Sequence, residues 1–339
     1  MPNLTTNGTD FMRVGFYISW NIGSLEAKNG NVIGEELLCR SFIKYLHKNY
    51  DITVDLYAPN HLPDSKLDIM IYMNDDIPNI QWAAKNIIYL QNGFESGGDL
   101  VLKNIQKRGY DGYIFYSHKL FELNKELGGQ GIYLPFSADT EEFYPRAPNP
   151  SYAFDCAYVG NDIKGKERSE RFILPALNYN FGLFGYWPKR TLKQQIKQCL
   201  GFSKPMYTYQ IQLSEIARGK IPQSEVPVLY SSAKINLNCT IQDCVDMNTI
   251  TSRTFEVLAC KGFLITDKVP IAEELLKDCV VFTNGGQELA EQIEYYLAYP
   301  EKCRKIAERG YQYTIKYATR EARVKELYDY LIKIVKGEK

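Results

Sequence analysis

The feature that most constrains this chain is an alternation of short apolar runs with segments of helical periodicity, which starts at Met12. This alternation is typical of β-α-β units around a parallel sheet. A helix is predicted over Glu35–Lys48, where apolar residues recur every three or four positions. The predicted strands of this half are Arg13–Ile18, Thr53–Ala58, Ile69–Met73, Asn86–Leu90, Gly112–Tyr116 and Gly131–Leu134. The pattern therefore predicts an α/β fold with one doubly wound domain here.

A second α/β domain is predicted after the proline-rich stretch 134–150, which resembles an interdomain connection. Its predicted strands are Phe154–Val159, Asn180–Phe184, Lys234–Asn238, Phe263–Thr266 and Val280–Phe282. At 339 residues the chain is long for a single domain. We expect a flexible extension over 1–11, an N-terminal domain over 12–145, a C-terminal domain over 146–318, and a helix over 319–339 that packs across the domain junction.

Composition argues against several function classes. Forty basic and forty acidic residues balance, with no long basic run, so nucleic acid is not an expected partner. Eight scattered cysteines without a C-x-x-C pair fit reduced thiols and a cytoplasmic location. The N-terminus lacks a secretory pattern, and no apolar run is long enough to span a membrane. No His pair or Asp-x-Asp has ligand spacing, so neither a metal nor another cofactor is expected.

The stretch 251–267, TSRTFEVLACKGFLITD, is the best candidate for a ligand site. It reads as a short capped helix that leads through a glycine turn into a strand. With Ser252 as its N-cap, the first turn would carry Arg253 and Thr254, where free N–H groups and the helix dipole favour a diphosphate. Glu256 could accept hydrogen bonds from both hydroxyls of a ribose. The alternative for Arg253 and Glu256 is an ordinary solvated helix surface.

A second basic element, VGNDIKGKERSER, covers residues 159–171. A strand, a Gly-Asn turn and then Lys164 and Lys166 can hold a phosphate, although solvated charge runs are common.

In the first half, two loops that follow predicted strands carry candidate catalytic groups. Glu95 lies in QNGFESGG and could act as a base on an incoming hydroxyl, and His118 follows a strand and could contact a phosphate or act as a base. A flexible loop with one solvated Glu is the alternative for Glu95. The Gly30 and Gly34 region resembles a phosphate loop but matches neither the dinucleotide nor the P-loop motif.

The sequence SRTFEVLACKGFLITD, followed by FTNGGQELAEQIEYYLAYPEKCRKIAERGYQYT, resembles the C-terminal domain of the CgeB-like (spore-maturation) glycosyltransferases. The resemblance covers about residues 225–325, extends to V-G-N and LPFSADTEEFYP, and is faint in the first domain. It implies a GT-B fold, with two Rossmann-like doubly wound domains facing across a cleft.

The resemblance also implies roles for residues on the donor side. Glu256 matches the ribose-binding glutamate, Arg253 and Thr254 fall near the diphosphate, and Gly160–Asn161 matches a phosphate-contacting turn. Four positions fall where the fold frames the nucleobase: Gly185, Tyr186, Ile221 and Pro222. Two positions depart from the family pattern. Asn248 replaces a glutamate, which leaves the contact to the transferred sugar and the retaining or inverting outcome open, and Lys261 stands where glycine is common.

The leading hypothesis is a metal-independent glycosyltransferase of the hexosyltransferase type. It would move a sugar from a nucleotide-sugar, with UDP as the expected nucleotide, to a hydroxyl of a glycan, lipid-linked or protein acceptor in surface glycan or glycoconjugate synthesis. Peripheral membrane contact would fit such acceptors. Two further hypotheses remain open: a sugar-nucleotide epimerase on the same fold, and a catalytically silent module that binds a nucleotide or glycan. A scaffold role is a third, less favoured hypothesis.

Overall fold

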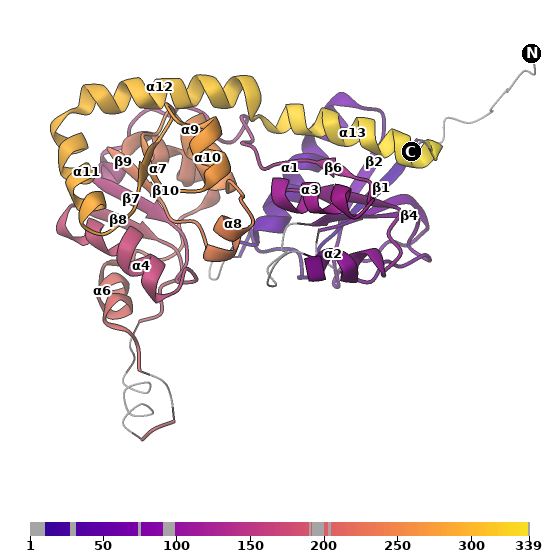
Figure 1. Cartoon of the computed structure of the whole chain (residues 1–339), viewed down its shortest axis with the longest axis horizontal. Coiled ribbons are helices and arrows are strands. Elements are labelled where there is room, and N and C mark those ends of the chain that lie inside the picture. Colours follow the sequence, from indigo (N-terminus) through magenta and orange to yellow (C-terminus); the bar gives the residue numbers. More distant parts are fainter. Residues whose placement is uncertain are drawn as a thin grey trace, which may run out of the picture. The chain divides into compact units, whose positions relative to one another are not determined.

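The computed structural model describes residues 11–27, 32–73, 76–90, 99–189, 191, 200–202 and 205–337. The chain divides into two compact units. Unit 1 consists of Met1–Glu26, Val32–Leu134 and Arg320–Lys339, and unit 2 of Ala27–Asn31 and Pro135–Thr319. Figure 1 shows the order of the elements along the chain.

Unit 1 is built on a six-stranded parallel sheet with the order β2-β1-β3-β4-β5-β6. Its strands lie within a few residues of the predicted ones, and those inside the sheet are mostly buried. They are β1 (Arg13–Tyr17), β2 (Thr53–Tyr57), β3 (Leu67–Tyr72), β4 (Ala83–Leu90), β5 (Gly112–Phe115) and β6 (Ile132–Tyr133).

Four helices of unit 1 are described, namely α1 (Gly34–Asn49), α2 (Asp99–Gln106), α3 (His118–Glu126) and α13 (Arg320–Lys336). The predicted apolar face of α1 is buried, and Phe42 stacks on Phe16 of β1 with ring centroids 5.9 Å apart. The C-terminal helix α13 packs on unit 1. Its Tyr328 stacks on Tyr50, and the Tyr330 hydroxyl accepts a 2.9 Å hydrogen bond from the Tyr113 N–H.

Unit 2 contains a five-stranded parallel sheet with the order β11-β10-β9-β7-β8. Each predicted strand of the second half is present. They are β7 (Cys156–Val159), β8 (Phe181–Phe184), β9 (Ile235–Asn238), β10 (Leu264–Asp267) and β11 (Val281–Thr283). Because all the strands run in the same direction, their carboxyl ends meet at one edge of the sheet.

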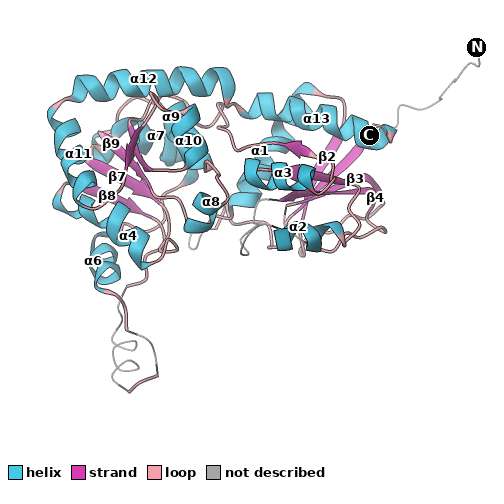
Figure 2. Cartoon of the chain, in the orientation of Figure 1, coloured by secondary structure: helices cyan, strands magenta, loops and turns pink. Residues whose placement is uncertain are grey.

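Helices cover both faces of the unit 2 sheet, as Figure 2 shows. Two apolar clusters result: one includes Leu229 and Leu258, and the other Leu213 and Ile293. The helices are α4 (Lys166–Phe172), α6 (Thr208–Ile216), α7 (Val226–Ser232), α8 (Gln242–Asp246), α9 (Ser252–Ala259), α10 (Pro270–Leu275), α11 (Gln287–Ala298) and α12 (Pro300–Tyr317). Both units therefore have the layered, doubly wound arrangement that the alternating sequence predicts.

Candidate functional site

The candidate site lies at the carboxyl edge of the unit 2 sheet. The loops after β7, β8, β9 and β10 begin at this edge. Helix α9 also starts beside this edge, because the chain must return to the opposite edge of the sheet before β10 begins. Ligands of open α/β sheets bind at this edge, where loop residues and helix N-termini converge. Most of the predicted donor-side residues lie on these loops.

The loops after β7 and β8 are held tightly together. The Asn161 side-chain oxygen accepts a 2.8 Å hydrogen bond from the Tyr186 N–H, and the Gly160 carbonyl accepts one of 2.9 Å from the Trp187 indole. Gly185 has a φ of +125°, and a Cβ there would lie 2.2 Å from the Gly160 carbonyl oxygen. Only glycine fits this position. The structure thus brings together Gly160, Asn161, Gly185 and Tyr186, and the Tyr186 side chain is exposed.

The next residues of the β7 loop place Lys164 near the sheet. Asp162 fixes the loop by accepting hydrogen bonds from the Tyr209 hydroxyl, at 3.2 Å, and the Gln210 amide, at 2.6 Å, both on α6. Burial and the charge of Arg253 lower the pKa of Lys164 to about 8. Within the described residues, the Lys164 ammonium has no hydrogen bond or ion pair.

Helix α9 begins one residue earlier than predicted. Thr251, in an extended conformation, is the N-cap, and Ser252 is the first helical residue. Both residue types favour the cap position, so the sequence alone does not choose between them. The Thr251 side chain accepts no hydrogen bond from the helix, so no side chain caps the N–H groups of the first turn. Thr254 in that turn is buried.

Arg253 points from α9 back over the strand ends. Its guanidinium donates a 2.9 Å hydrogen bond to the Asn238 side-chain oxygen at the end of β9 and lies 5.2 Å from the centre of the Tyr158 ring. Burial disfavours its charge, but Tyr158, Tyr230 and Glu256 raise its pKa. The hydrogen bond to Asn238 and the contact with the Tyr158 ring are to neutral groups, and no ion pair joins Arg253 to another described residue.

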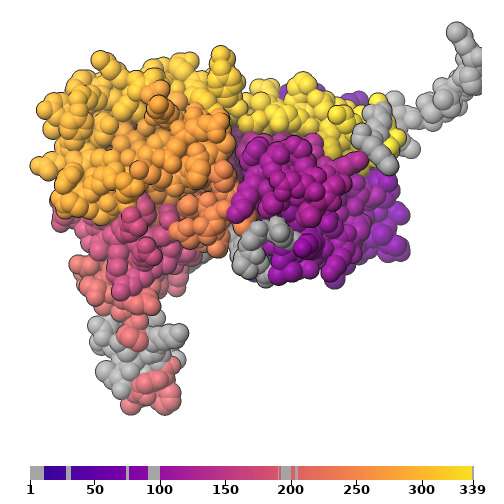
Figure 3. Space-filling view, in the orientation of Figure 1, coloured from indigo at the N-terminus to yellow at the C-terminus, as the bar shows by residue number. Residues whose placement is uncertain are grey.

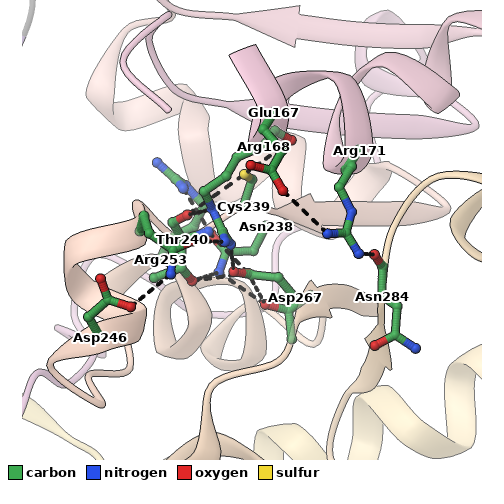
Figure 4. Close-up of polar contacts among 12 residues, drawn as sticks. Glu167, Arg168, Arg171, Asn238, Cys239, Thr240, Asp246, Arg253, Asp267 and Asn284 are labelled. Carbon is green, nitrogen blue, oxygen red and sulfur yellow. Dashed lines mark hydrogen bonds and ion pairs between the residues drawn. The ribbon is translucent and has the colours of Figure 1, made fainter. Parts of the chain in front are cut away.

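A second arginine at the same edge is neutralised (Figure 4). Arg168 of α4 forms an ion pair with the buried Asp267 at the end of β10. The Asp267 carboxylate also accepts 3.0 Å hydrogen bonds from the Thr240 N–H and hydroxyl. Arg168 is therefore committed within the protein, in contrast with Arg253 and Lys164. The sequence analysis did not predict the Arg168–Asp267 ion pair or the role of Asn238. The only sequence feature that could have indicated Asn238 is its position as a polar residue at the end of a strand.

Glu256 is half-buried one turn after Arg253. Together with burial, its charge raises the pKa of Tyr230 on α7. The carboxylate thus lies on the same side of α9 as Arg253.

The two departures from the family pattern have structural roles. Asn248 has a φ of 53°, and its side-chain oxygen accepts a 2.7 Å hydrogen bond from the Ile271 N–H in the first turn of α10. Lys261 has a φ of 56° and follows the end of α9, where its ammonium lies 2.8 Å from Glu308. Asn248 is thus engaged in joining a turn to a helix.

The other predicted donor-side residues lie farther along the same loops. Lys166 is exposed, with its ammonium 5.4 Å from the centre of the Tyr207 ring. Ile221 is buried and Pro222 is exposed, and their segment lies beside the end of β8 because the Gly185 N–H donates to the Gly219 carbonyl.

The predicted catalytic residues belong to unit 1. Glu95 lies outside the described residues. His118 is the first residue of α3, and its side chain is 45% exposed with Nε2 3.6 Å from the Glu122 carboxylate.

Among the residues that the structure describes, no group of three or more His, Cys, Asp or Glu could hold a metal ion. In the same part of the chain, no helix has both the length and the apolar character that a membrane span requires.

Residues 168–329 match the model of a family described as glycosyl transferase-like. No curated protein matches the chain. Several solved structures are similar. Sucrose-phosphate synthase from Thermosynechococcus elongatus shares 13% identity at a TM-score of 0.67, over 96% of this chain and all of that one. HepE from Anabaena, in complex with UDP and glucose, shares 12% identity at a TM-score of 0.62, over 95% of this chain and all of that one.

T4 phage BGT in complex with its UDP-glucose substrate shares 16% identity at a TM-score of 0.60, over 96% of this chain and 99% of that one. These similarities confirm the predicted α/β fold class. Residues 168–329 are thus similar to a glycosyl transferase-like family, and the chain has the fold of these GT-B glycosyltransferase structures.

Proposed function

We propose that this protein is a glycosyltransferase that moves a sugar from a nucleotide-sugar, a UDP-sugar, to an acceptor hydroxyl. One observation carries the proposal. Lys164 and Arg253 are close enough for the charge of one to lower the pKa of the other, and no described residue forms an ion pair with either. Two neighbouring cations at the ligand-binding edge of a parallel sheet suit a diphosphate.

The cost of this arrangement argues for a ligand. Lys164 and Arg253 are both half-buried. A partly buried cation without an ion-pair partner is unfavourable for the fold, and a second cation beside it adds repulsion. Arg168 on the same edge avoids that cost through its ion pair with Asp267. A diphosphate bound between Lys164 and Arg253 would remove the repulsion and raise the pKa of Lys164 again. Perturbed groups of this kind cluster at functional sites.

The remaining donor-side residues fit the other parts of a nucleotide. Glu256, beside Arg253, would accept hydrogen bonds from the ribose hydroxyls. The joined loops at Gly185–Tyr186 and Ile221–Pro222 would frame the base. UDP is proposed because HepE and T4 phage BGT, which share the fold, were solved with UDP or UDP-glucose.

In the proposed reaction, the bond between the sugar and the diphosphate breaks and negative charge grows on the departing phosphate oxygen. Lys164, Arg253 and the uncapped N-terminus of α9 would stabilise that charge. We propose that these groups suffice without a metal ion. Glu95 or His118 would remove the proton of the acceptor hydroxyl, so Glu95→Gln should lower turnover more than donor affinity.

A catalytically silent nucleotide-binding module is the second candidate, and Asn248 is the observation that favours it. Its side chain joins a turn to α10, so this position supplies no carboxylate to a transferred sugar. Such a module would bind UDP-sugars without hydrolysing or transferring them. A sugar-nucleotide epimerase would instead release an altered UDP-sugar in the absence of an acceptor.

We further propose that the protein is CgeB-like and acts in the cytoplasm on a glycan, lipid-linked or protein acceptor, in surface glycan or glycoconjugate synthesis. The sequence resemblance over residues 225–325 supports this placement. Product analysis across an acceptor panel would test it.

The first test is a thermal-shift and titration screen of the protein against UDP, GDP, dTDP, CMP and their sugars. A ligand of the native state raises the melting temperature, and UDP compounds should do so selectively. Glu256→Ala should weaken UDP binding by about 1–3 kcal/mol through loss of a charge-assisted contact. Glu274→Ala, at an exposed site on α10, is the matched control. Unchanged UDP affinity in folded Glu256→Ala would remove Glu256 from the site.

A further inference from the structure

A chain of buried polar side chains leads to Arg253 from the end of β10. Asp267 accepts hydrogen bonds from the hydroxyls of Thr240, at 3.0 Å, and Thr266, at 3.2 Å. The Asn238 amide nitrogen donates in turn to the Thr266 hydroxyl, at 3.1 Å, and to the Thr240 hydroxyl, at 3.5 Å. We call these four residues the relay. Its last member, Asn238, is the residue that accepts the hydrogen bond of Arg253.

The relay lies inside unit 2. Each of its side chains is at most 4% exposed, whereas the segment around α10 forms part of the surface that Figure 3 shows in orange. Asn238 and Thr266 are direct neighbours in the register of β9 and β10, and Figure 4 shows Asn238 with Thr240 and Asp267 at the carboxyl edge of the sheet. Every polar side-chain atom of the relay has a partner. A buried network that is complete in this way has a fixed arrangement.

The direction of each hydrogen bond in the relay is set from Asp267 outward. As the ion-pair partner of Arg168, Asp267 is a carboxylate and can only accept hydrogen bonds. Each threonine hydroxyl has a single hydrogen, which it donates to Asp267, so its oxygen is left to accept from Asn238. The Asn238 nitrogen must therefore face the threonines, and its oxygen must face Arg253. Since the two ends of an amide have nearly the same shape, the order of donors decides which end Arg253 meets.

The acceptor that Arg253 meets is therefore neutral. The Asn238 oxygen fixes the guanidinium through a 2.9 Å hydrogen bond and leaves its charge in place. A carboxylate at the same position would form an ion pair, as Asp267 does with Arg168. Charge-assisted pairs of this kind are strong and directional, so an arginine held by one is poorly available to a bound anion.

We propose that Asn238 is a positioning residue for the donor site. The relay turns its amide oxygen toward Arg253, which keeps the guanidinium oriented and charged for the diphosphate of the nucleotide-sugar. Asn238 acts through Arg253, and the relay itself does not contact the ligand because its side chains are buried. This inference rests on the proposed function, since it concerns how the donor site is prepared.

Titration calorimetry with UDP and with uridine tests the proposal. Thr266→Val removes one hydroxyl of the relay and nearly keeps the shape of the side chain. UDP affinity should fall about fivefold, because Asn238 loses its 3.1 Å partner and its amide can turn. Thr266→Ser keeps the hydroxyl and should bind UDP as the wild type does. Uridine, which has no phosphate, should bind all three proteins equally.

Asn238→Asp tests the charge of the acceptor. The new carboxylate would pair with Arg253, so UDP affinity should fall by about tenfold or more while uridine affinity stays the same. Thr283→Val is the matched control for Thr266→Val. Thr283 ends β11 and is buried, and its hydroxyl accepts a 3.0 Å hydrogen bond from the Gly285 N–H outside the relay. This control should bind UDP as the wild type does, and melting temperatures show which variants are folded.

The proposal is wrong if folded Thr266→Val and Asn238→Asp bind UDP as tightly as the wild type, or if they lose uridine affinity to the same extent as UDP affinity. A wild type that binds no UDP would contradict the proposed function instead. Side-chain NMR of Arg253 in the ligand-free protein then tests the relay by itself. Rotation of the guanidinium should be slow in the wild type and in Thr266→Ser, and faster in Thr266→Val. Equal rotation in the wild type and Thr266→Val would overturn the role of the relay.

Discussion

At the scale of single residues, Lys164 has the most unusual environment of the candidate site. Burial and the charge of Arg253 lower its pKa to about 8, whereas Lys166, two residues away, is exposed with its ammonium over the Tyr207 ring. The sequence ranked the two lysines together because their difference depends on burial in the fold and on Arg253 of α9, which lies more than eighty residues later. A contact between distant segments creates the site, and local patterns carry little information about it.

The pH dependence of UDP binding follows from Lys164. The anion should bind the ammonium form, which predominates below a pKa of about 8, and binding should raise that pKa. Affinity should therefore be highest below pH 8 and fall above it, by up to about tenfold per pH unit. Titration calorimetry at several pH values between about 7 and about 9, on either side of the Lys164 pKa, measures the UDP affinity.

Lys164→Arg keeps its charge at every pH and is the control. Its affinity should not change over the same pH range. A flat profile for the wild type would show that Lys164 does not contact the anion.

At the scale of elements, helix α9 shows what the sequence could predict and what it could not. The helix, the following glycine turn and strand β10 all lie where the residue pattern placed them. The exact first residue of α9 was not predicted, because Thr251 and Ser252 both favour the N-cap position. The strands were predicted to within a few residues because their apolar runs are long, buried and bounded by turn residues. Arg253 contacts Asn238 and Tyr158. The sequence did not predict these contacts, because only the order of the strands in the sheet brings the three residues together.

The end of α9 allows a stability prediction. The Gly262 N–H bonds to the Val257 carbonyl and the Lys261 N–H to the Leu258 carbonyl, which is the Schellman pattern with Lys261 in the left-handed conformation. Glycine adopts this conformation without strain. Lys261→Gly should therefore raise the free energy of unfolding by about 0.5–1 kcal/mol, measured by urea denaturation.

Lys261→Gly also removes the exposed ion pair with Glu308. Glu308→Gln removes that pair alone and should have little effect, since exposed pairs contribute little. A lower stability of Lys261→Gly than of Glu308→Gln would contradict the strain argument.

At the scale of the whole molecule, the chain combines two parallel-sheet units, and the match to GT-B structures covers nearly all of it. Unit 2 carries the proposed donor site, and its strand-end loops could be predicted from residue types alone. Unit 1 carries the proposed catalytic residues, and there the sequence resemblance is faint. The donor site can therefore be tested before the acceptor is identified.

Metal dependence belongs to this scale because it concerns the complete reaction. Turnover of a UDP-sugar should persist in excess EDTA, since Lys164, Arg253 and the α9 N-terminus are proposed to stabilise the leaving diphosphate. A structure of T4 phage BGT was solved with UDP and Mn²⁺, so the test is pertinent to this fold. Loss of turnover in EDTA that Mn²⁺ restores would overturn the metal-free proposal.

The most direct measurement is a calorimetric titration of wild type, Lys164→Met and Lys277→Met with UDP and with uridine. Lys164→Met should fold stably, because it removes a poorly placed charge, and Lys277 is an exposed control in unit 2. We predict that Lys164→Met weakens UDP binding by about tenfold or more, the worth of one charge-assisted contact, and leaves uridine binding and the control unchanged. Equal UDP affinity in Lys164→Met and wild type would contradict a diphosphate site at this edge of the sheet.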